Sequence, residues 1–253
     1  MQEFKSEFVH SYHTYSFGYC NYAIKEKKDI LSDIYNKGYL PYSGEEGIKN
    51  ILYMARSARV NLKDFVLNSE NRRVLRKFDD KFEFEKIPLN KFNFKDKKFI
   101  KFCLNYFEKK HGDKIMPKKR LETVLKANFI TNILVYKDMD GDIIAYVYEV
   151  DDKKISHVWL YFYDLDYSDQ SLGMWLMIDM ARRSKLEGKK YFYVGTIYGE
   201  KALYKTNFDF LEYWNGNEWI KNKKKLKQRS RSDYQREFNN IDEFKEGKNI
   251  DFK

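Results

Sequence analysis

The sequence predicts an α/β (α+β) fold with a mixed central sheet and a small N-terminal α/β subdomain. Between residues 129 and 221, strand-like and helix-like segments follow one another in the order β-β-β-α-β-α-β-β. Apolar residues make up 43% of the 253 residues, which is enough to fill the core of such a sheet. Only three prolines occur, so we expect no long linker. We divide the chain into an N-terminal part, residues 1–80, and a larger part, residues 81–253.

The larger part has the clearer pattern, because apolar runs of strand length are separated by turn residues. Gly141 and Gly188 stand where a hairpin turn and a helix end would need a positive φ angle. The predicted elements are the helices Lys97–His111 and Pro117–Ala127, the strands Phe129–Tyr136, Ile143–Val150 and Ile155–Tyr163, a helix ending near Leu186, the strand Tyr191–Thr196, the short helix Gly199–Thr206, and a hairpin of Asp209–Tyr213 with Glu218–Lys221.

The N-terminal part is less regular. We predict helices at Lys28–Lys37 and Ser69–Phe78, the second with Ser69 as its N-cap, and a half-buried strand at Ile51–Val60. Residues 81–95 have phenylalanines two positions apart on both sides of Pro88, and we interpret them as a connection.

The net charge of +10 is concentrated in two segments. Residues 221–231 contain seven basic residues and no acidic one, and residues 52–77 contain seven Lys or Arg against two acids. A polyanion would bind at these segments, although a lysine-rich run can also be a solvated tail. Arginines favour the first interpretation for residues 52–77, because a guanidinium suits phosphate and carboxylate groups.

The two cysteines, Cys20 and Cys103, are too few for a disulfide framework or a cysteine-based metal site. We therefore expect no metal. The sequence shows no signal peptide and no apolar run long enough to span a membrane, so we expect a soluble cytoplasmic protein without membrane contact.

The predicted element order resembles the core of GNAT-type acyltransferases. In that fold a strand leads into a turn whose backbone amides bind an anionic group at a helix N-terminus. Here the turn would be Ser168–Met174, with Ser171, Leu172 and Gly173 at its centre. Gly173 would allow the donor to approach the backbone closely.

Four short motifs narrow the resemblance to the arginyl- and leucyl-tRNA–protein transferases. The family has a Phe-Tyr-Asp strand end, Ser-Leu-Gly at a helix start, Tyr-x-Gly on a strand, and Tyr-Lys before a phenylalanine. The matching segments occur here in the same order and at similar spacing: Phe162-Tyr163-Asp164, Ser171-Leu172-Gly173, Tyr193-Val194-Gly195 and Tyr204-Lys205-Thr206-Asn207-Phe208.

The N-terminal part also resembles this family, in the segments Leu40-Pro41-Tyr42-Ser43-Gly44, Ala55-Arg56-Ser57-Ala58-Arg59-Val60 and Ser69-Glu70-Asn71-Arg72-Arg73. It departs from the family at the cysteines. Phe17-Gly18-Tyr19-Cys20 stands where eukaryotic members have Cys-Gly-Tyr-Cys, and the later cysteines are absent. This indicates a compact form without an iron–sulfur centre, because such a cluster needs about four thiolates.

The resemblance implies transfer of Arg or Leu from charged tRNA to the N-terminal α-amine of a protein, which marks that protein as an N-degron. Such a reaction needs positioning and help for the leaving ribose oxygen, with no activated nucleophile on the enzyme and no cofactor beyond the aminoacyl-tRNA. We assign the leaving-group role to Tyr204, the proton-accepting role to Asp164 or Asp166, and a phosphate contact to Lys205.

Family members favour acceptors that begin with an acidic residue, whose carboxylate needs a cationic partner. Arg56 and Arg59, or Arg72 and Arg73, could supply it. The partners would be charged tRNA and acidic protein N-termini, bound by a monomer. The residues expected to contact the tRNA backbone are Lys221, Lys223, Lys224, Lys225, Lys227 and Arg229.

Two other functions remain open. Acyl-CoA-dependent N-acetylation would use the same turn, although Trp175 stands where acetyltransferases usually have a small residue. A non-catalytic RNA-binding module would need the basic segments but neither Tyr204 nor Asp164.

Overall fold

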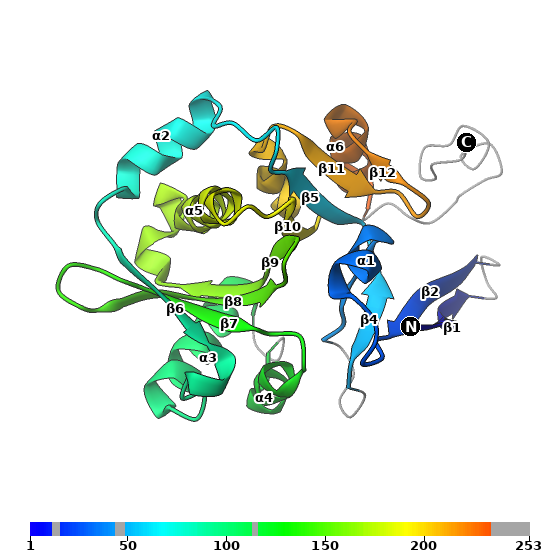
Figure 1. Cartoon of the computed structure of the whole chain (residues 1–253), viewed down its shortest axis with the longest axis horizontal. Coiled ribbons are helices and arrows are strands. Elements are labelled where there is room, and N and C mark those ends of the chain that lie inside the picture. Colours follow the sequence, from blue (N-terminus) through cyan, green and yellow to red (C-terminus); the bar gives the residue numbers. More distant parts are fainter. Residues whose placement is uncertain (12–15, 44–48, 113–115, 234–253) are drawn as a thin grey trace.

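The computed structural model describes residues 1–11, 16–43, 49–112 and 116–233, which form two β-sheets and the helices packed on them (Figure 1). The smaller sheet is antiparallel, in the order β1-β2-β4-β3, and the larger is mixed, in the order β12-β11-β5-β10-β9-β8-β7-β6. This confirms the predicted mixed central sheet, accompanied by a separate small N-terminal sheet.

The smaller sheet takes its strands from the first 54 residues. Its short helix α1, Leu31–Asn36, ends just before Gly38, whose φ of +80° a side chain would rarely adopt. One face packs against the larger sheet through Ala23, Leu52 and Tyr35, which join Val150 and Ile155 in one cluster. The strands are β1 (Gln2–Ser11), β2 (Ser16–Ile24), β3 (Tyr39–Pro41) and β4 (Ile51–Met54).

The larger sheet is antiparallel except for one pair, because β10 runs parallel to β9. That pair is joined through a helix, as parallel strands require. The strands are β5 (Ser57–Asn61), β6 (Glu83–Pro88), β7 (Asn132–Lys137), β8 (Ile143–Asp151), β9 (Ile155–Tyr163), β10 (Tyr191–Thr196), β11 (Leu211–Trp214) and β12 (Trp219–Ile220).

Helices cover both faces of the larger sheet (Figure 1). On one face lie α5 (Leu172–Leu186) and α2 (Ser69–Phe78), and on the other α3 (Lys97–His111) and α4 (Lys118–Lys126). α5 is apolar around most of its circumference and buries eleven of its residues. It therefore fixes the turn that precedes it against the core.

Residues 81–95 correct one prediction, because they contain an edge strand as well as a connection. β6 pairs along its length with β7, and Phe84 packs its ring on Tyr136. The two-residue phenylalanine spacing was the strand signal. Pro88 is tolerated because it is the last residue of an edge strand.

The predicted strand Ile51–Val60 is two strands in different sheets. β4 ends at Met54 in the smaller sheet, and β5 begins at Ser57 between β10 and β11. β5 and α2 thus pack with the larger sheet, although both lie before residue 80 in the sequence. The domain boundary at residue 80 stays a prediction. The N-cap of α2 is Asn68, whose side chain accepts from Asn71 N, in place of Ser69.

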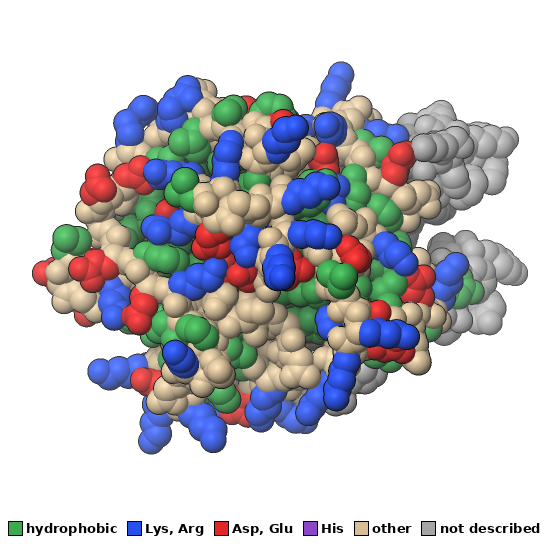
Figure 2. All heavy atoms as spheres, in the orientation of Figure 1, with side chains coloured by type: hydrophobic (Ala, Val, Ile, Leu, Met, Phe, Trp, Pro, Cys, Tyr) green, Lys and Arg blue, Asp and Glu red, His purple; other side chains and the backbone are tan. Residues whose placement is uncertain are grey.

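The basic segment at residues 221–231 contains a helix, α6 (Lys223–Arg231), that the sequence did not predict. Its buried Leu226 anchors it in the main core, and it packs against β11 and against the 3₁₀ helix η3 (Glu200–Asn207). Figure 2 shows Lys and Arg side chains spread over the face seen in Figure 1, with Asp and Glu between them. The basic residues of α6 therefore belong to a helix that is packed against the rest of the fold.

Candidate active site

The parallel strands β9 and β10 pair only near their beginnings and then separate. Their register runs from Tyr191 opposite Ile155 to Tyr193 opposite His157, and β10 then has an irregularity against β5 between Tyr193 and Gly195. Gly195 has a φ of +81°, which favours glycine. Where the strands part, a cavity of about 840 Å³ opens.

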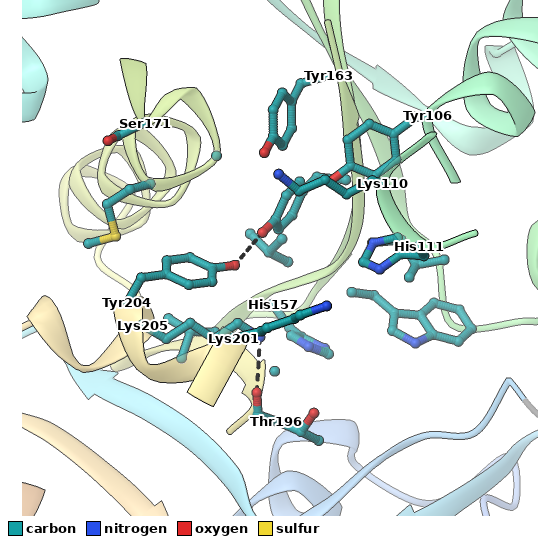
Figure 3. A pocket seen from close by; sticks show the side chains of 18 of the residues that line it. Tyr106, Lys110, His111, His157, Tyr163, Ser171, Thr196, Lys201, Tyr204 and Lys205 are labelled. Carbon is teal, nitrogen blue, oxygen red and sulfur yellow. Dashed lines mark hydrogen bonds between the residues drawn. The ribbon is translucent and has the colours of Figure 1, made fainter. Parts of the chain in front are cut away.

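Several helices and the smaller sheet complete the walls of this cavity (Figure 3). The N-terminus of α5 and the 3₁₀ helix η3 lie on one side and α3 on another, and α2 and the smaller sheet, the latter through Leu40 and Tyr53, also contribute to the lining. Among the described residues, its lining contains three lysines, Lys110, Lys201 and Lys205, and one carboxylate, Glu70, which is paired with Arg73. The cavity is therefore electropositive and suits an anionic ligand.

The Ser171–Gly173 turn lies at the cavity wall. Ser171 has left-handed backbone angles, and its carbonyl oxygen accepts from the N–H groups of Met174 and Trp175. The first N–H groups of a helix have no partner within the helix, so they can bind an anion. A Cβ on Gly173 would stand 3.1 Å from the Tyr163 ring, so glycine is needed for packing as well as for access. Leu172 is fully buried and lies in the core.

Tyr204 reaches the middle of the cavity from η3 and exchanges a short hydrogen bond with the hydroxyl of Tyr161 on β9 (Figure 3). Burial raises the pKa of both hydroxyls above the ordinary value for tyrosine. Both are therefore protonated near neutral pH. If Tyr161 donates to Tyr204, the Tyr204 proton is directed at a ligand.

Lys205, His157, Thr196 and Gly195 form the inner end of the cavity, which we call the cavity floor. Lys205 donates from Nζ to the Thr196 carbonyl oxygen at 3.0 Å, and desolvation lowers its pKa to about 8. Tyr35 from α1 holds His157 by a 2.9 Å hydrogen bond at Nδ1. Burial, with Lys205 as a smaller contribution, lowers the pKa of His157 to about 3, so this imidazole is neutral.

His157 gives a testable pH dependence. The unfolded chain takes up a proton at this residue near the ordinary pKa of 6.5, whereas the folded chain does so only near 3. The unfolding free energy therefore falls as the pH drops through that window, by up to about 1.4 kcal/mol per pH unit. We expect urea denaturation from pH 7 to pH 4 to show this loss in the wild type and a shallower slope in His157→Gln. Parallel slopes for the two proteins would contradict the assignment.

The predicted carboxylates lie elsewhere. Asp164 accepts from Asp166 N and caps the 3₁₀ helix η2 (Leu165–Gln170), and neither residue is among the described residues that line the cavity. In the structure Asp164 therefore acts as a helix cap, and the proton-accepting role of Asp164 or Asp166 stays a prediction.

The predicted arginines also have other partners. Arg56 forms a two-pronged ion pair with Asp233 and also donates to Ile197 O, and Arg59 pairs with Glu212 at 2.9 Å. Both are buried, and none of the four arginines lines the cavity. On α2, Arg73 pairs with Glu70, and Arg72 donates to the Leu67 carbonyl oxygen. The guanidinium groups of Arg56 and Arg59 thus already bind carboxylates of this chain, and their predicted carboxylate-reading role stays a prediction.

The predicted tRNA-contacting residues lie on or next to α6. Lys223 pairs with Asp209 and Lys221 lies 3.9 Å from Glu212, whereas the side chains of Lys224 and Lys225 are exposed. A shallow hollow between the lysines is lined by Lys223, Lys224, Lys227, Gln228 and Arg231. Arg229 is half-buried on the same helix. The segment thus presents one cationic surface, on the far side of η3 from the cavity.

Several residues of the cavity were missed by sequence reasoning. Lys110 donates to Ser168 Oγ at 2.9 Å, and it and Lys201 lower the pKa of His111 beyond the effect of burial. Lys110 and His111 belong to α3, whereas Lys201 belongs to η3, about 90 positions later in the sequence. Among the missed cavity residues, only His157 stands out in the sequence, because it is a histidine within an otherwise apolar strand.

Residues 124–206 match the family described as acetyltransferase (GNAT) domain. The match covers about a third of the 253 residues. The mixed sheet, the separated parallel strands and the helix turn beside them make up the GNAT-like fold predicted from the sequence, so that prediction is confirmed. Most of the described residues that line the cavity fall within the matched segment.

Solved structures similar to this chain are distant. The C-terminal domain of a putative lysylphosphatidylglycerol synthetase from Agrobacterium fabrum is 16% identical with a TM-score of 0.44, covering 60% of this chain and 50% of that one. L-PGS from Bacillus licheniformis is 18% identical with a TM-score of 0.43, covering 56% and 46%. FemX is 10% identical with a TM-score of 0.41, covering 66% and 59%. This chain thus spans about half the length of the first two. No curated protein sequence matches it.

Within the described ranges, no three His, Cys, Asp or Glu side chains gather as a metal site would require. None of the described helices is long and apolar enough to cross a bilayer.

Proposed function

We propose that this protein transfers an amino acid, Arg or Leu, from charged tRNA to the N-terminal α-amine of proteins that begin with an acidic residue. The observation that carries the proposal is the electropositive cavity at the N-terminus of α5, with Tyr204 inside it and the basic helix α6 behind the same η3 segment. A polyanionic donor fits both features, because its reactive end can enter the cavity while its backbone lies on the lysines outside. We retain a monomer in the cytoplasm, without a metal or further cofactor, as part of this proposal.

The chemistry needs few groups. The acceptor amine attacks the ester carbonyl carbon, the bond from that carbon to the ribose oxygen breaks, and the leaving oxygen takes a proton. A free α-amine has a pKa of about 7.7–8.0, so part of it is already neutral near pH 7 and can attack without a strong base. Tyr204 donates the proton to the ribose oxygen, and the Tyr161 hydroxyl supports it. The proton released by the amine passes to solvent.

Helix α6 gives a salt-dependent prediction. We expect the triple variant Lys224→Gln, Lys225→Gln and Lys227→Gln to bind charged tRNA more weakly and to lower the slope of log K against log salt by up to about 2.7, because each lost phosphate contact contributes about 0.9. Filter binding across a salt series measures both. Lys185→Gln, on the distant end of α5, is the matched control. An unchanged slope in the triple variant would rule out α6 as the tRNA contact.

Acyl-CoA-dependent N-acetylation is the second candidate, since the matched family is described as an acetyltransferase domain. Trp175, which we took as an argument against a CoA path, packs between Phe78, Phe82 and Tyr136 and donates to Asp79. Its bulk therefore lies in the core and leaves the turn open, so Trp175 does not exclude acetyl-CoA.

One assay separates these functions. The protein is mixed with tRNA charged with radiolabelled Leu or Arg, or with labelled acetyl-CoA, and with peptides beginning with Asp, Glu or Ala. Label transfer from tRNA to the acidic peptides supports the proposal, and transfer from acetyl-CoA alone supports the second candidate. Binding of tRNA without any transfer would indicate a non-catalytic RNA-binding module.

A further inference from the structure

The cavity floor contains a cation without an anionic partner. Within the described part of the chain, the Lys205 ammonium has one hydrogen bond, to the neutral carbonyl oxygen of Thr196. Its side chain is half-buried and lines the cavity. An ammonium removed from water without a counter-charge is unfavourable, and a ligand anion would relieve that cost.

A second donor points at the same small space. His157 Nε2 is buried and has no hydrogen-bond partner, although the residue is only 1% exposed. Nδ1 is engaged by the Tyr35 hydroxyl, whose own proton has no other acceptor among the described residues. Tyr35 is therefore the donor of that bond, which leaves Nε2 carrying a hydrogen.

The space between the two nitrogens is left open by a glycine. A Cβ on Gly195 would stand 3.6 Å from Lys205 Nζ and 3.7 Å from His157 Nε2. The ammonium supplies one positive charge and the neutral imidazole supplies none, so one singly charged anion neutralises the floor. A carboxylate has that charge and two oxygens, one for each donor.

The other cations do not compete for this role. Arg56 and Arg59 already bind Asp233 and Glu212 inside the chain, and Lys110 and Lys201 stand at the cavity mouth with exposed side chains. We propose that Lys205 and His157 bind the side-chain carboxylate of the acceptor's first residue, with Tyr35 as the positioning residue that fixes the imidazole. This assigns Lys205 to the acceptor in place of the phosphate contact predicted from sequence, and it rests on the proposed function for the acceptor class.

The test is equilibrium binding of two peptides, without tRNA. Asp-Ala-Ala-Ala-amide and Asn-Ala-Ala-Ala-amide differ only in the charge at the first side chain. Calorimetry should show about tenfold or tighter binding of the Asp peptide to the wild type, as expected for a charge-assisted contact. Lys205→Met should reduce that ratio to less than about twofold, and Lys205→Arg should restore part of it.

Controls separate a local role from damage to the fold. Lys185→Met is matched, because Lys185 also donates from Nζ to a backbone carbonyl, that of Phe65, and it should keep the wild-type ratio. Tyr35→Phe should lower the ratio without abolishing it, since the ammonium remains. Equal binding of the two peptides by the wild type, or a ratio that survives in Lys205→Met, would overturn the inference, as would inorganic phosphate binding at Lys205 in preference to the Asp peptide.

Failure of the two proposals can be told apart. A wild-type preference for the Asp peptide that depends on Lys205, with no label transferred from tRNA, contradicts the proposed function and supports the carboxylate site. Label transfer that is equally fast to Asp and Asn peptides supports the function and contradicts the site.

Discussion

Tyr204→Phe is expected to lower kcat for amino-acid transfer by about 100-fold, the lower end of what a positioned general acid contributes. The substitution removes one hydroxyl and keeps the ring that fills the cavity wall. The Tyr161 hydroxyl then loses its partner, and the leaving ribose oxygen loses its proton donor. KM for both substrates should change by less than about twofold, because the contact is made in the transition state.

The comparison with Tyr161→Phe tests which of the two hydroxyls donates the hydrogen bond between Tyr161 and Tyr204. If Tyr161 donates to Tyr204, its loss leaves Tyr204 able to protonate the leaving group, and kcat should fall by only about tenfold. Tyr167→Phe is the control, since that ring packs against Phe78 and Phe82, away from the cavity lining. A Tyr204→Phe enzyme that turns over at the wild-type rate would exclude Tyr204 as the acid and leave the hydroxyl with a packing role.

The segments from β7 to β10 were predictable because their signals are local. Apolar runs of strand length, the turn glycine Gly141 and the helix-ending Gly188 each depend on neighbouring residues alone, and both glycines have a positive φ. The Ser171 turn was found for the same reason. Phe82 and Phe84 carried an equally local strand signal, which the presence of Pro88 obscured.

The candidate site was less predictable because its contacts join distant segments. Arg56 and Arg59 have the residue type and spacing expected of carboxylate readers. Their partners, Asp233 and Glu212, lie more than 150 positions away in the sequence and satisfy them inside the fold. His157 acquires its neutral, oriented state from Tyr35, 122 positions earlier. The type and spacing of residues in the sequence indicate which chemistry they can perform. The topology of the fold determines which other groups of the chain they contact.

Arg59→Ala is expected to lower the unfolding free energy by about 3–5 kcal/mol, because it leaves a buried carboxylate with only the distant, exposed Lys221 as counter-ion. Arg59 pairs with Glu212, which is 6% exposed, and donates to Asn36 Oδ1 at 2.7 Å. Its guanidinium also lies between the rings of Tyr191 and Trp219, at 3.7 and 3.8 Å from their centroids. One side chain thus ties α1 of the smaller sheet to β10, β11 and β12 of the larger one.

Urea denaturation of matched variants tests this stabilising role. Arg73→Ala breaks an exposed pair on one helix turn and should leave the midpoint unchanged. The double variant Arg59→Met with Glu212→Leu should recover part of the loss, because it removes the unpaired charge along with the pair. If Arg59→Ala is as stable as the wild type, Arg59 has no structural role. It must then be considered again as a residue that binds the carboxylate of an acidic acceptor. A large loss, with recovery in the double variant, would fix Arg59 as a structural residue and leave Lys205 as the cation available inside the cavity.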